Sequence, residues 1–148
     1  MSALRKFLRL PSENRRMLVT ALFAVAMIRL GLKALPFQKL LLLLNRLAER
    51  PRGRKDPDPL YERRVLWAVS AAARRLLRNK PCLTQAIAVQ LLFRRQGLPA
   101  ALHIGVAKDE QGHLKAHAWV ESNDEIVIGG AASPFEYRAF PSLDLAGK

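Results

Sequence analysis

The spacing of the hydrophobic residues changes once along the chain, and this change restricts the fold more than any other feature. Up to Gln96 these residues recur at helical spacing, which predicts helices over residues 12–35, 37–47, 60–77 and 82–96. Three short β segments follow, separated by polar loops, over residues 101–108, 114–121 and 125–130. We therefore predict an α+β fold, in which an N-terminal helical segment precedes a helix packed on a small antiparallel sheet.

One stretch has the composition of a linker. Residues 49–59 read ERPRGRKDPDP, with three prolines and one glycine among alternating charges. We predict an N-terminal helical segment with a basic linker over residues 1–58, and a core over residues 59–148. The structure of the tail from Ala131 cannot be assigned from its pattern.

The charge of the chain is concentrated in its first half. The net charge is +13; residues 1–81 contribute +14 and residues 82–148 contribute −1. Such a field favours acidic partners, namely a protein face, an anionic lipid surface or a nucleic acid, although solvated arginines explain it equally well. Aromatic residues make up 7% of the chain, too few for a single-strand nucleic-acid platform, so no nucleic-acid partner is expected.

The N-terminal apolar run points to a cytoplasmic protein. Residues 17–28 are apolar but lack a signal-peptidase site, and the run is shorter than the ~20 residues that a bilayer span needs. We expect a buried helix or a peripheral membrane contact through the basic N-terminal helices.

The chain has a single cysteine and three scattered histidines. An intrachain disulfide is therefore impossible, and no metal site is expected because the histidines lack paired spacing. The glycines are dispersed and form no phosphate-binding loop, so no cofactor is expected. A lone cysteine suits a reducing compartment.

Cys82 is the candidate nucleophile because it opens a predicted helix. Unpaired backbone N–H groups and the helix dipole stabilise a thiolate there, and the same groups can hold an oxyanion on an attacked carbonyl. Packing alone accounts for the position about as well, since cysteine is among the most buried residues.

His117 is the candidate general base. It lies in the predicted strand KAHAWVES, and alternation places it on one face with Lys115, Trp119 and Glu121. The small residues of the other face are expected to pack inward. A helix followed by an antiparallel strand can bring a cysteine and a histidine within hydrogen-bond reach. Trp119 would then shield the imidazole or serve as an ordinary core aromatic.

Three blocks of sequence together resemble a known family. The blocks CLTQAIAVQLLFRRQGLPAALHIGV, HLKAHAWVES and EIVIGG, over about residues 80–130, resemble the stand-alone leader peptidase, or B protein, of lasso-peptide biosynthesis. That family lies in the transglutaminase-like, papain-related cysteine protease superfamily. The resemblance implies a papain/transglutaminase-like core in which Cys82 is the nucleophile and His117 the base. It also implies cleavage of a ribosomally made precursor peptide, with a leader-binding recognition-element protein and an ATP-dependent lasso cyclase as partners.

The third catalytic residue of the family has no match. The resemblance places an aspartate about a dozen residues after the histidine, where this chain has Ile128-Gly129-Gly130. Asp124 is expected to be a turn residue: if Ser122 pairs with Glu125, Asp124 lies on the order of 20 Å up the hairpin from His117. A backbone carbonyl, a water or a tail residue such as Glu136 is then expected to orient the imidazole.

Other polar residues are weaker candidates. Gln85 could point its amide at an oxyanion but is better explained as a solvated helix residue. His113 is expected at an exposed loop edge. If Lys108 pairs with His113, then Ile104 pairs with His117, so that His103 faces away from the site and is structural.

These observations leave three functional hypotheses. The first is the peptidase. A transglutaminase-like acyl transferase would use the same two residues and differ only in its acceptor. A non-catalytic peptide-binding module would keep the fold and explain the missing acid.

Overall fold

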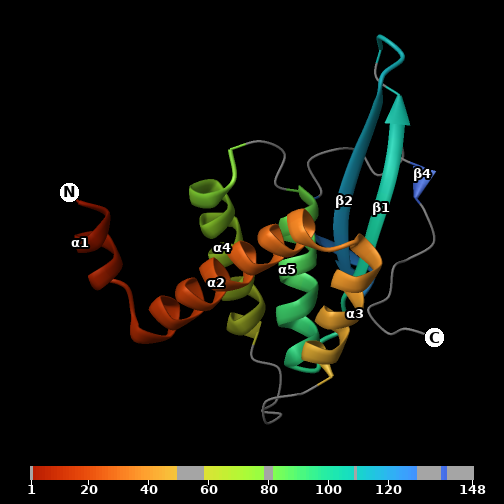
Figure 1. The fold of residues 1–148 in the computed structure, drawn as a ribbon. Helices are drawn as coiled ribbons and strands as arrows, with labels where there is room; N and C mark the ends of the chain where they lie inside the picture. Colours follow the sequence, from red (N-terminus) through yellow and green to blue (C-terminus); the bar gives the residue numbers. More distant parts are fainter. Residues whose placement is uncertain (1, 50–58, 79–81, 109, 130–137, 140–148) are drawn as a thin grey trace.

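The computed structural model describes residues 2–49, 59–78, 82–108, 110–129 and 138–139 (Figure 1). Its helices and strands come in the order α1 to α5 and then β1 to β4. The fold is α+β, as predicted, with a small antiparallel sheet following the helices. The predicted linker and most of the tail lie outside the described residues, so the proposed boundary after residue 58 stays a prediction.

The helices agree with the predicted periodicity to within one or two residues. They are α1 (Ala3–Leu8), α2 (Ser12–Ala34), α3 (Phe37–Ala48), α4 (Pro59–Leu76) and α5 (Cys82–Arg95). The sequence pattern did not predict α1, which has six residues and no buried side chain. Helix α2 ends before Leu35 and Pro36, where the proline ring disfavours a helical conformation of the preceding residue.

Helix α5 is the centre of the molecule. Nine of its residues are buried, and it contacts α2, α3, α4 and β2. Its largest buried side chain is Phe93, which is fully enclosed. The core is one cluster that joins the buried faces of α2, α3, α4, α5 and the sheet. The burial of α5 fixes its axis, and therefore fixes where its first residue, Cys82, is presented.

Polar side chains fix α2 and α4 against each other. Nη1 of Arg29 on α2 donates a 3.0 Å hydrogen bond to the Leu76 carbonyl at the end of α4, where helix carbonyls lack intrahelical partners. Near the other end of the contact, Arg64 lies 2.6 Å from the carboxylate of Glu13. Arg29 interrupts the apolar pattern of α2 in the sequence because its side chain completes the end of a neighbouring helix.

Helix α2 is the one described helix that is long and apolar enough to cross a membrane. It has a mean hydropathy of 1.8 over its most apolar window, of which 28% is buried inside the protein. Its buried residues, among them Val25 and Ile28, belong to the core cluster. Arg29 and Lys33 lie within this helix and do not end it.

The sheet has four antiparallel strands in the order β3-β2-β1-β4. These strands are β1 (Ala101–Lys108), β2 (Leu114–Ser122), β3 (Glu125–Ile128) and the two-residue β4 (Arg138–Ala139). Helix α5 packs against β2 and β1 (Figure 1). Ala118 and Val120 are buried in the core, as the alternation of small residues in β2 predicted, but Ala116, expected on the same inward face, is exposed.

The pairing of β1 with β2 differs from the predicted pairing by one residue. Lys108 pairs with Leu114 instead of His113, so Gly105 rather than Ile104 lies opposite His117. A shift of one residue moves every side chain of a strand to the other face. The prediction that His103 faces away from His117 is therefore wrong: His103 pairs with Trp119, on the same face as His117.

Candidate active site

Cys82 is the first residue of α5, as predicted. Its side chain is partly exposed, while nine of the later residues of the helix are buried. The first turn of any helix has backbone N–H groups without intrahelical acceptors, and these groups favour a negative charge near them. The position combines access from solvent with backbone N–H groups that can donate hydrogen bonds to an oxyanion.

His117 lies in β2, half-buried, with its imidazole fixed by the backbone. Its Nε2 lies 2.5 Å from the carbonyl oxygen of Gly129, in the residue that follows β3. A carbonyl can only accept a hydrogen bond, so Nε2 carries the hydrogen and, in the neutral ring, Nδ1 carries the lone pair. The contact therefore selects Nδ1 as the nitrogen able to take up a proton.

Gly129 can make this contact because it has no side chain. Its φ of +86° lies in the left-handed region that glycine adopts without strain. A Cβ at this position would lie 2.6 Å from the Ala118 carbonyl oxygen and 2.9 Å from Cα and Cβ of Trp119. The backbone of Gly129 thus lies directly against β2 at Ala118 and Trp119, and this close approach presents its carbonyl to the imidazole.

The β2–β3 hairpin explains why the backbone comes so close. Ser122 pairs with Glu125, as predicted, and both Asn123 and Asp124 have positive φ, of 51° and 63°. Two successive positive φ values are typical of a type I′ turn, so Asp124 is a turn residue as expected. A register shift between Val120 and Glu121 then advances β3 by one residue, which changes what lies beside His117.

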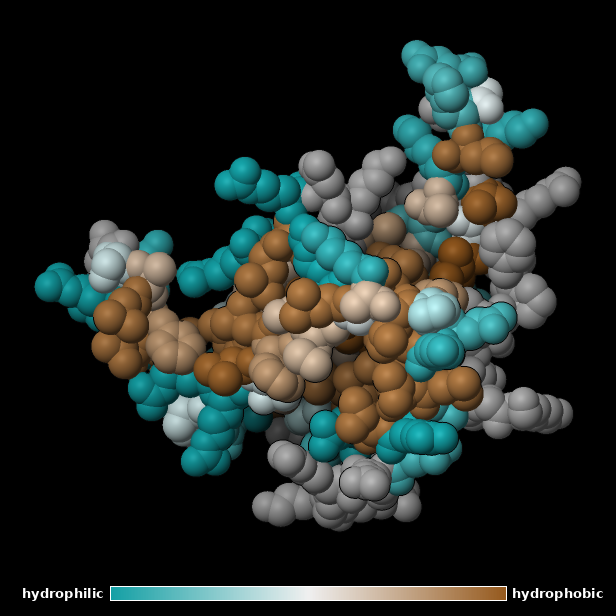
Figure 2. All heavy atoms as spheres, in the orientation of Figure 1, coloured by the Kyte–Doolittle hydropathy of each residue, from teal (hydrophilic) through white to brown (hydrophobic). Residues whose placement is uncertain are grey.

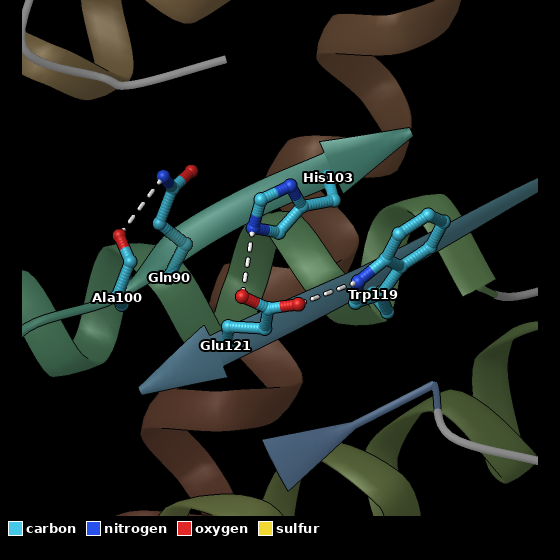
Figure 3. Close-up of polar contacts among 5 residues, drawn as sticks. All are labelled: Gln90, Ala100, His103, Trp119 and Glu121. Carbon is cyan, nitrogen blue, oxygen red and sulfur yellow. Dashed lines mark hydrogen bonds and ion pairs between the residues drawn. The ribbon is translucent and has the colours of Figure 1, made fainter. Parts of the chain in front are cut away.

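A group of aromatic and charged side chains lies next to His117 on the same face. The Trp119 ring stacks between two imidazoles, 6.2 Å from the centroid of His117 and 5.5 Å from that of His103. Nε1 of Trp119 donates a 3.4 Å hydrogen bond to Oε1 of Glu121, whose Oε2 lies 3.3 Å from Nε2 of His103 (Figure 3). We call His103, Trp119 and Glu121 the Trp119 cluster. It holds the indole as a wall beside the His117 imidazole.

One hydrogen bond between α5 and the sheet gives a reference point for the positions of Cys82 and His117. Nε2 of Gln90 on α5 donates a hydrogen bond to the carbonyl of Ala100 (Figure 3). The next residue, Ala101, is the first of β1 and pairs with Glu121 of β2. From Gln90 to Cys82 the helix rises about 12 Å, and from Glu121 to His117 the strand covers about 13 Å. Both α5 and β2 begin toward the tip of the β1–β2 hairpin (Figure 1), so Cys82 and His117 both lie on the tip side of this hydrogen bond. His117 lies on the face of β2 opposite to Ala118 and Val120, which pack in the core.

The remaining candidates have less to contribute. Gln85, expected to be a solvated helix residue, is half-buried one turn into α5. His113 is exposed, as predicted. Glu136 lies outside the described residues. A backbone carbonyl was among the expected orienting groups, but the sequence did not identify Gly129 as its source. Trp119 and Glu121 were expected on the face of His117, whereas the addition of His103 to that face was missed. The available signal for Gly129 was the Gly-Gly pair at the place where the family resemblance implies an acid.

Comparison with known proteins agrees with this arrangement of helix and sheet. Residues 21–141 match the family model described as the transglutaminase-like superfamily. No curated protein and no solved structure matches the chain. The matched stretch includes Cys82, His117 and Gly129, and it covers most of the chain. This protein therefore belongs to the transglutaminase-like superfamily, which commonly includes cysteine proteases and acyltransferases.

Proposed function

We propose that this protein is a cytoplasmic cysteine peptidase that removes the leader from a ribosomally made lasso-peptide precursor. Cys82 would be its nucleophile and His117 its general base. The observation that carries the proposal is the position of Cys82, partly exposed at the first residue of the buried helix of a transglutaminase-like fold. The resemblance of residues 80–130 to lasso leader peptidases supports the choice of substrate.

In the proposed reaction Nδ1 of His117 takes the thiol proton, and Sγ of Cys82 attacks the scissile carbonyl. The backbone N–H groups of the first turn of α5 stabilise the oxyanion. His117 then protonates the leaving amine, and a thioester joins Cys82 to the acyl fragment. Water attacks this thioester, with His117 taking a proton from the water, and the thiol is regenerated as the acid product leaves.

The use of a carbonyl in place of a carboxylate has a consequence for the rate. The Gly129 carbonyl fixes the tautomer and orientation of His117, but a neutral dipole stabilises the imidazolium less than a carboxylate would. A Cys–His pair tolerates this loss better than a serine-based pair, because the thiol needs less activation. We propose a slow peptidase that depends on its partners to present the precursor.

The proposed partners are the precursor peptide, a leader-binding recognition-element protein and an ATP-dependent lasso cyclase. The net charge of +14 on residues 1–81 favours an acidic partner, whose steering weakens in high salt. Cleavage should therefore be slow without the leader-binding protein, and its stimulation by that protein should decrease between 50 mM and 500 mM salt, given a Debye length of ~10 Å at 0.1 M.

The test is incubation with a synthetic precursor that spans the leader and the core, followed by mass spectrometry of the products. Hydrolysis yields two fragments whose masses sum to that of the precursor plus one water. Addition of a primary amine distinguishes acyl transfer, because a transferase product carries the mass of the amine. An intact precursor in the presence of the partner protein would contradict both catalytic hypotheses and favour a binding module.

A further inference from the structure

Two neighbouring helices expose a continuous set of large apolar side chains. On α2 they follow one helical row, with Phe23 68%, Met27 51% and Leu30 61% exposed. On α3, Leu43 and Leu47 are each nearly half exposed. We call these five residues the α2–α3 face. Figure 2 shows apolar side chains gathered over these helices on the side turned to the viewer. Soluble monomers rarely expose an apolar patch larger than a few hundred Å².

The α2–α3 face surrounds a shallow groove of about 420 Å³. Its floor is formed by small or buried residues of the two helices, such as Ala24 and Leu44, and by the last turns of α5. Thr20 and Arg95 supply the polar side chains of its lining. Protein interfaces carry roughly one hydrogen bond per 100–200 Å², and this lining offers few partners for such bonds. A hydrocarbon phase needs none.

The charges around the face all favour an anionic surface. Helices α2 and α3 contain six lysines and arginines but a single acidic residue, Glu13, near the start of α2. Arg16 lies one turn before Thr20 on the row of Phe23, and Lys39 and Arg46 lie next to Leu43; all three are exposed. Apolar side chains flanked by lysine and arginine are typical of helices that lie in the membrane interface.

We propose that the α2–α3 face binds the surface of an anionic lipid bilayer, with Phe23, Met27 and Leu30 inserted among the acyl chains. The basic residues around the face would contact the lipid headgroups. The mean hydropathy of α2, 1.8 over a window that is 28% buried, accords with a helix that meets protein on one side and lipid on the other. The orientation is peripheral, because the opposite side of α2 is part of the core.

Binding through this face leaves the candidate active site accessible. The groove contacts α5 at Leu91, Leu92 and Arg95, near the end of the helix, whereas Cys82 is its first residue. The separation along the axis is about 14–20 Å at ~1.5 Å per residue. A bilayer seated on α2 and α3 would therefore hold the protein while Cys82 remains open to a peptide. The inference does not depend on the proposed peptidase activity.

The experiment is flotation of the full-length protein with vesicles of phosphatidylcholine containing 30% phosphatidylglycerol, compared with phosphatidylcholine alone. We expect binding to the anionic vesicles and at least tenfold weaker binding to the neutral ones. Phe23→Ser should weaken anionic binding at least about tenfold, since the serine buries no aromatic surface among the acyl chains. Leu114→Ser is the matched control, because Leu114 is 70% exposed on β2 and away from the face; it should change binding less than twofold.

The contribution of the basic residues to vesicle binding is tested with two double variants that make the same change in net charge. Lys39→Glu with Arg46→Glu should abolish anionic binding, whereas Arg74→Glu with Arg75→Glu, at exposed positions of α4, makes the same change in net charge and should reduce it only modestly. Cys82→Ala should bind like the wild type.

Three results would overturn the lipid assignment. The first is no flotation of the wild-type protein, and the second is equal weakening by Phe23→Ser and Leu114→Ser. The third is a dimer in sedimentation velocity that Phe23→Ser dissociates, since the face would then be a contact between copies of this chain.

Discussion

The carbonyl oxygen of Gly129 lies 2.5 Å from Nε2 of His117, at the place where the family resemblance implies an aspartate. The chain thus keeps the orientation of the imidazole but changes the group that provides it. The rate of cleavage should therefore depend on His117 and on the backbone at Gly129, and an aspartate at position 129 should not raise it.

His117 should contribute far more to catalysis than Asp124, the acidic residue in the β2–β3 turn. His117→Asn removes the proton acceptor and should lower kcat/KM by at least about 100-fold, within the usual contribution of general acid–base catalysis. Asp124→Asn should lower it by less than about tenfold, because Asp124 lies in the turn. The comparison is of initial cleavage rates. Equal damage by the two substitutions would show that Asp124 reaches the imidazole.

Restoring the acid at position 129 should fail. Gly129→Asp and Gly129→Ala both introduce a Cβ that would lie 2.6 Å from the Ala118 carbonyl oxygen, and both require a positive φ. We expect each variant to lose at least tenfold in kcat/KM and a measurable part of its thermal stability. Gly112→Ala controls for backbone strain, because Gly112 has a φ of +81° with no atom near its Cβ position. A Gly129→Asp variant faster than the wild type would disprove this account of the carbonyl.

The Trp119 cluster should act through the position of the indole. Glu121→Ala leaves the buried Trp119 N–H without its acceptor, which costs about 1–3 kcal/mol of folding stability. Glu121→Gln keeps an acceptor oxygen and should cost less. Trp fluorescence in a Trp67→Phe background reports Trp119 alone, since the chain has two tryptophans. Identical spectra, stabilities and cleavage rates for the Ala and Gln variants would mean that Glu121 does not position Trp119.

Tyr61 should make stability depend on pH in the alkaline range. Burial raises the pKa of the Tyr61 phenol, against smaller lowering effects of the Gln96 hydrogen bond and the Arg95 charge. The folded state then keeps the proton after the unfolded chain has lost it, so stability is fully present below about pH 10 and decreases as the pH rises above that value. Tyr61 also donates a 3.3 Å hydrogen bond to the Leu92 carbonyl.

The test of this dependence is urea unfolding of the wild type and Tyr61→Phe between pH 8 and 11. At pH 8 the variant should be about 1 kcal/mol less stable, because it lacks the hydrogen bond. Above pH 10 the difference should shrink. A difference that stays constant up to pH 11 would contradict the raised pKa.

Helices α2 to α5 and strands β1 to β3 could be predicted from the sequence because each is specified by its own hydrophobic period, whereas the short α1 and β4 could not. Cys82 at the start of α5 follows from such local information. The face of the sheet on which His103 lies does not follow from local information, because it depends on the loop between β1 and β2. Lys108 pairs with Leu114, one residue beyond the predicted partner, and this shift moves His103 to the other face.

The role of Gly129 was hidden for a different reason. A backbone carbonyl is present at every residue, so a contact that uses one leaves no side-chain signature in the sequence. The irregular pairing next to Val120, which brings Gly129 against Ala118 and Trp119 of β2, also depends on tertiary packing rather than on the local pattern.

Cys82 is the proposed nucleophile of the proposed leader peptidase. The most direct measurement is the rate of leader release from the synthetic precursor by the wild type and by Cys82→Ala, followed by mass spectrometry, with far-UV circular dichroism of both proteins. We predict no detectable release by Cys82→Ala and identical spectra, because Cys82 is partly exposed and adds little to the core. Leader release by Cys82→Ala at a rate comparable to the wild type would contradict the account.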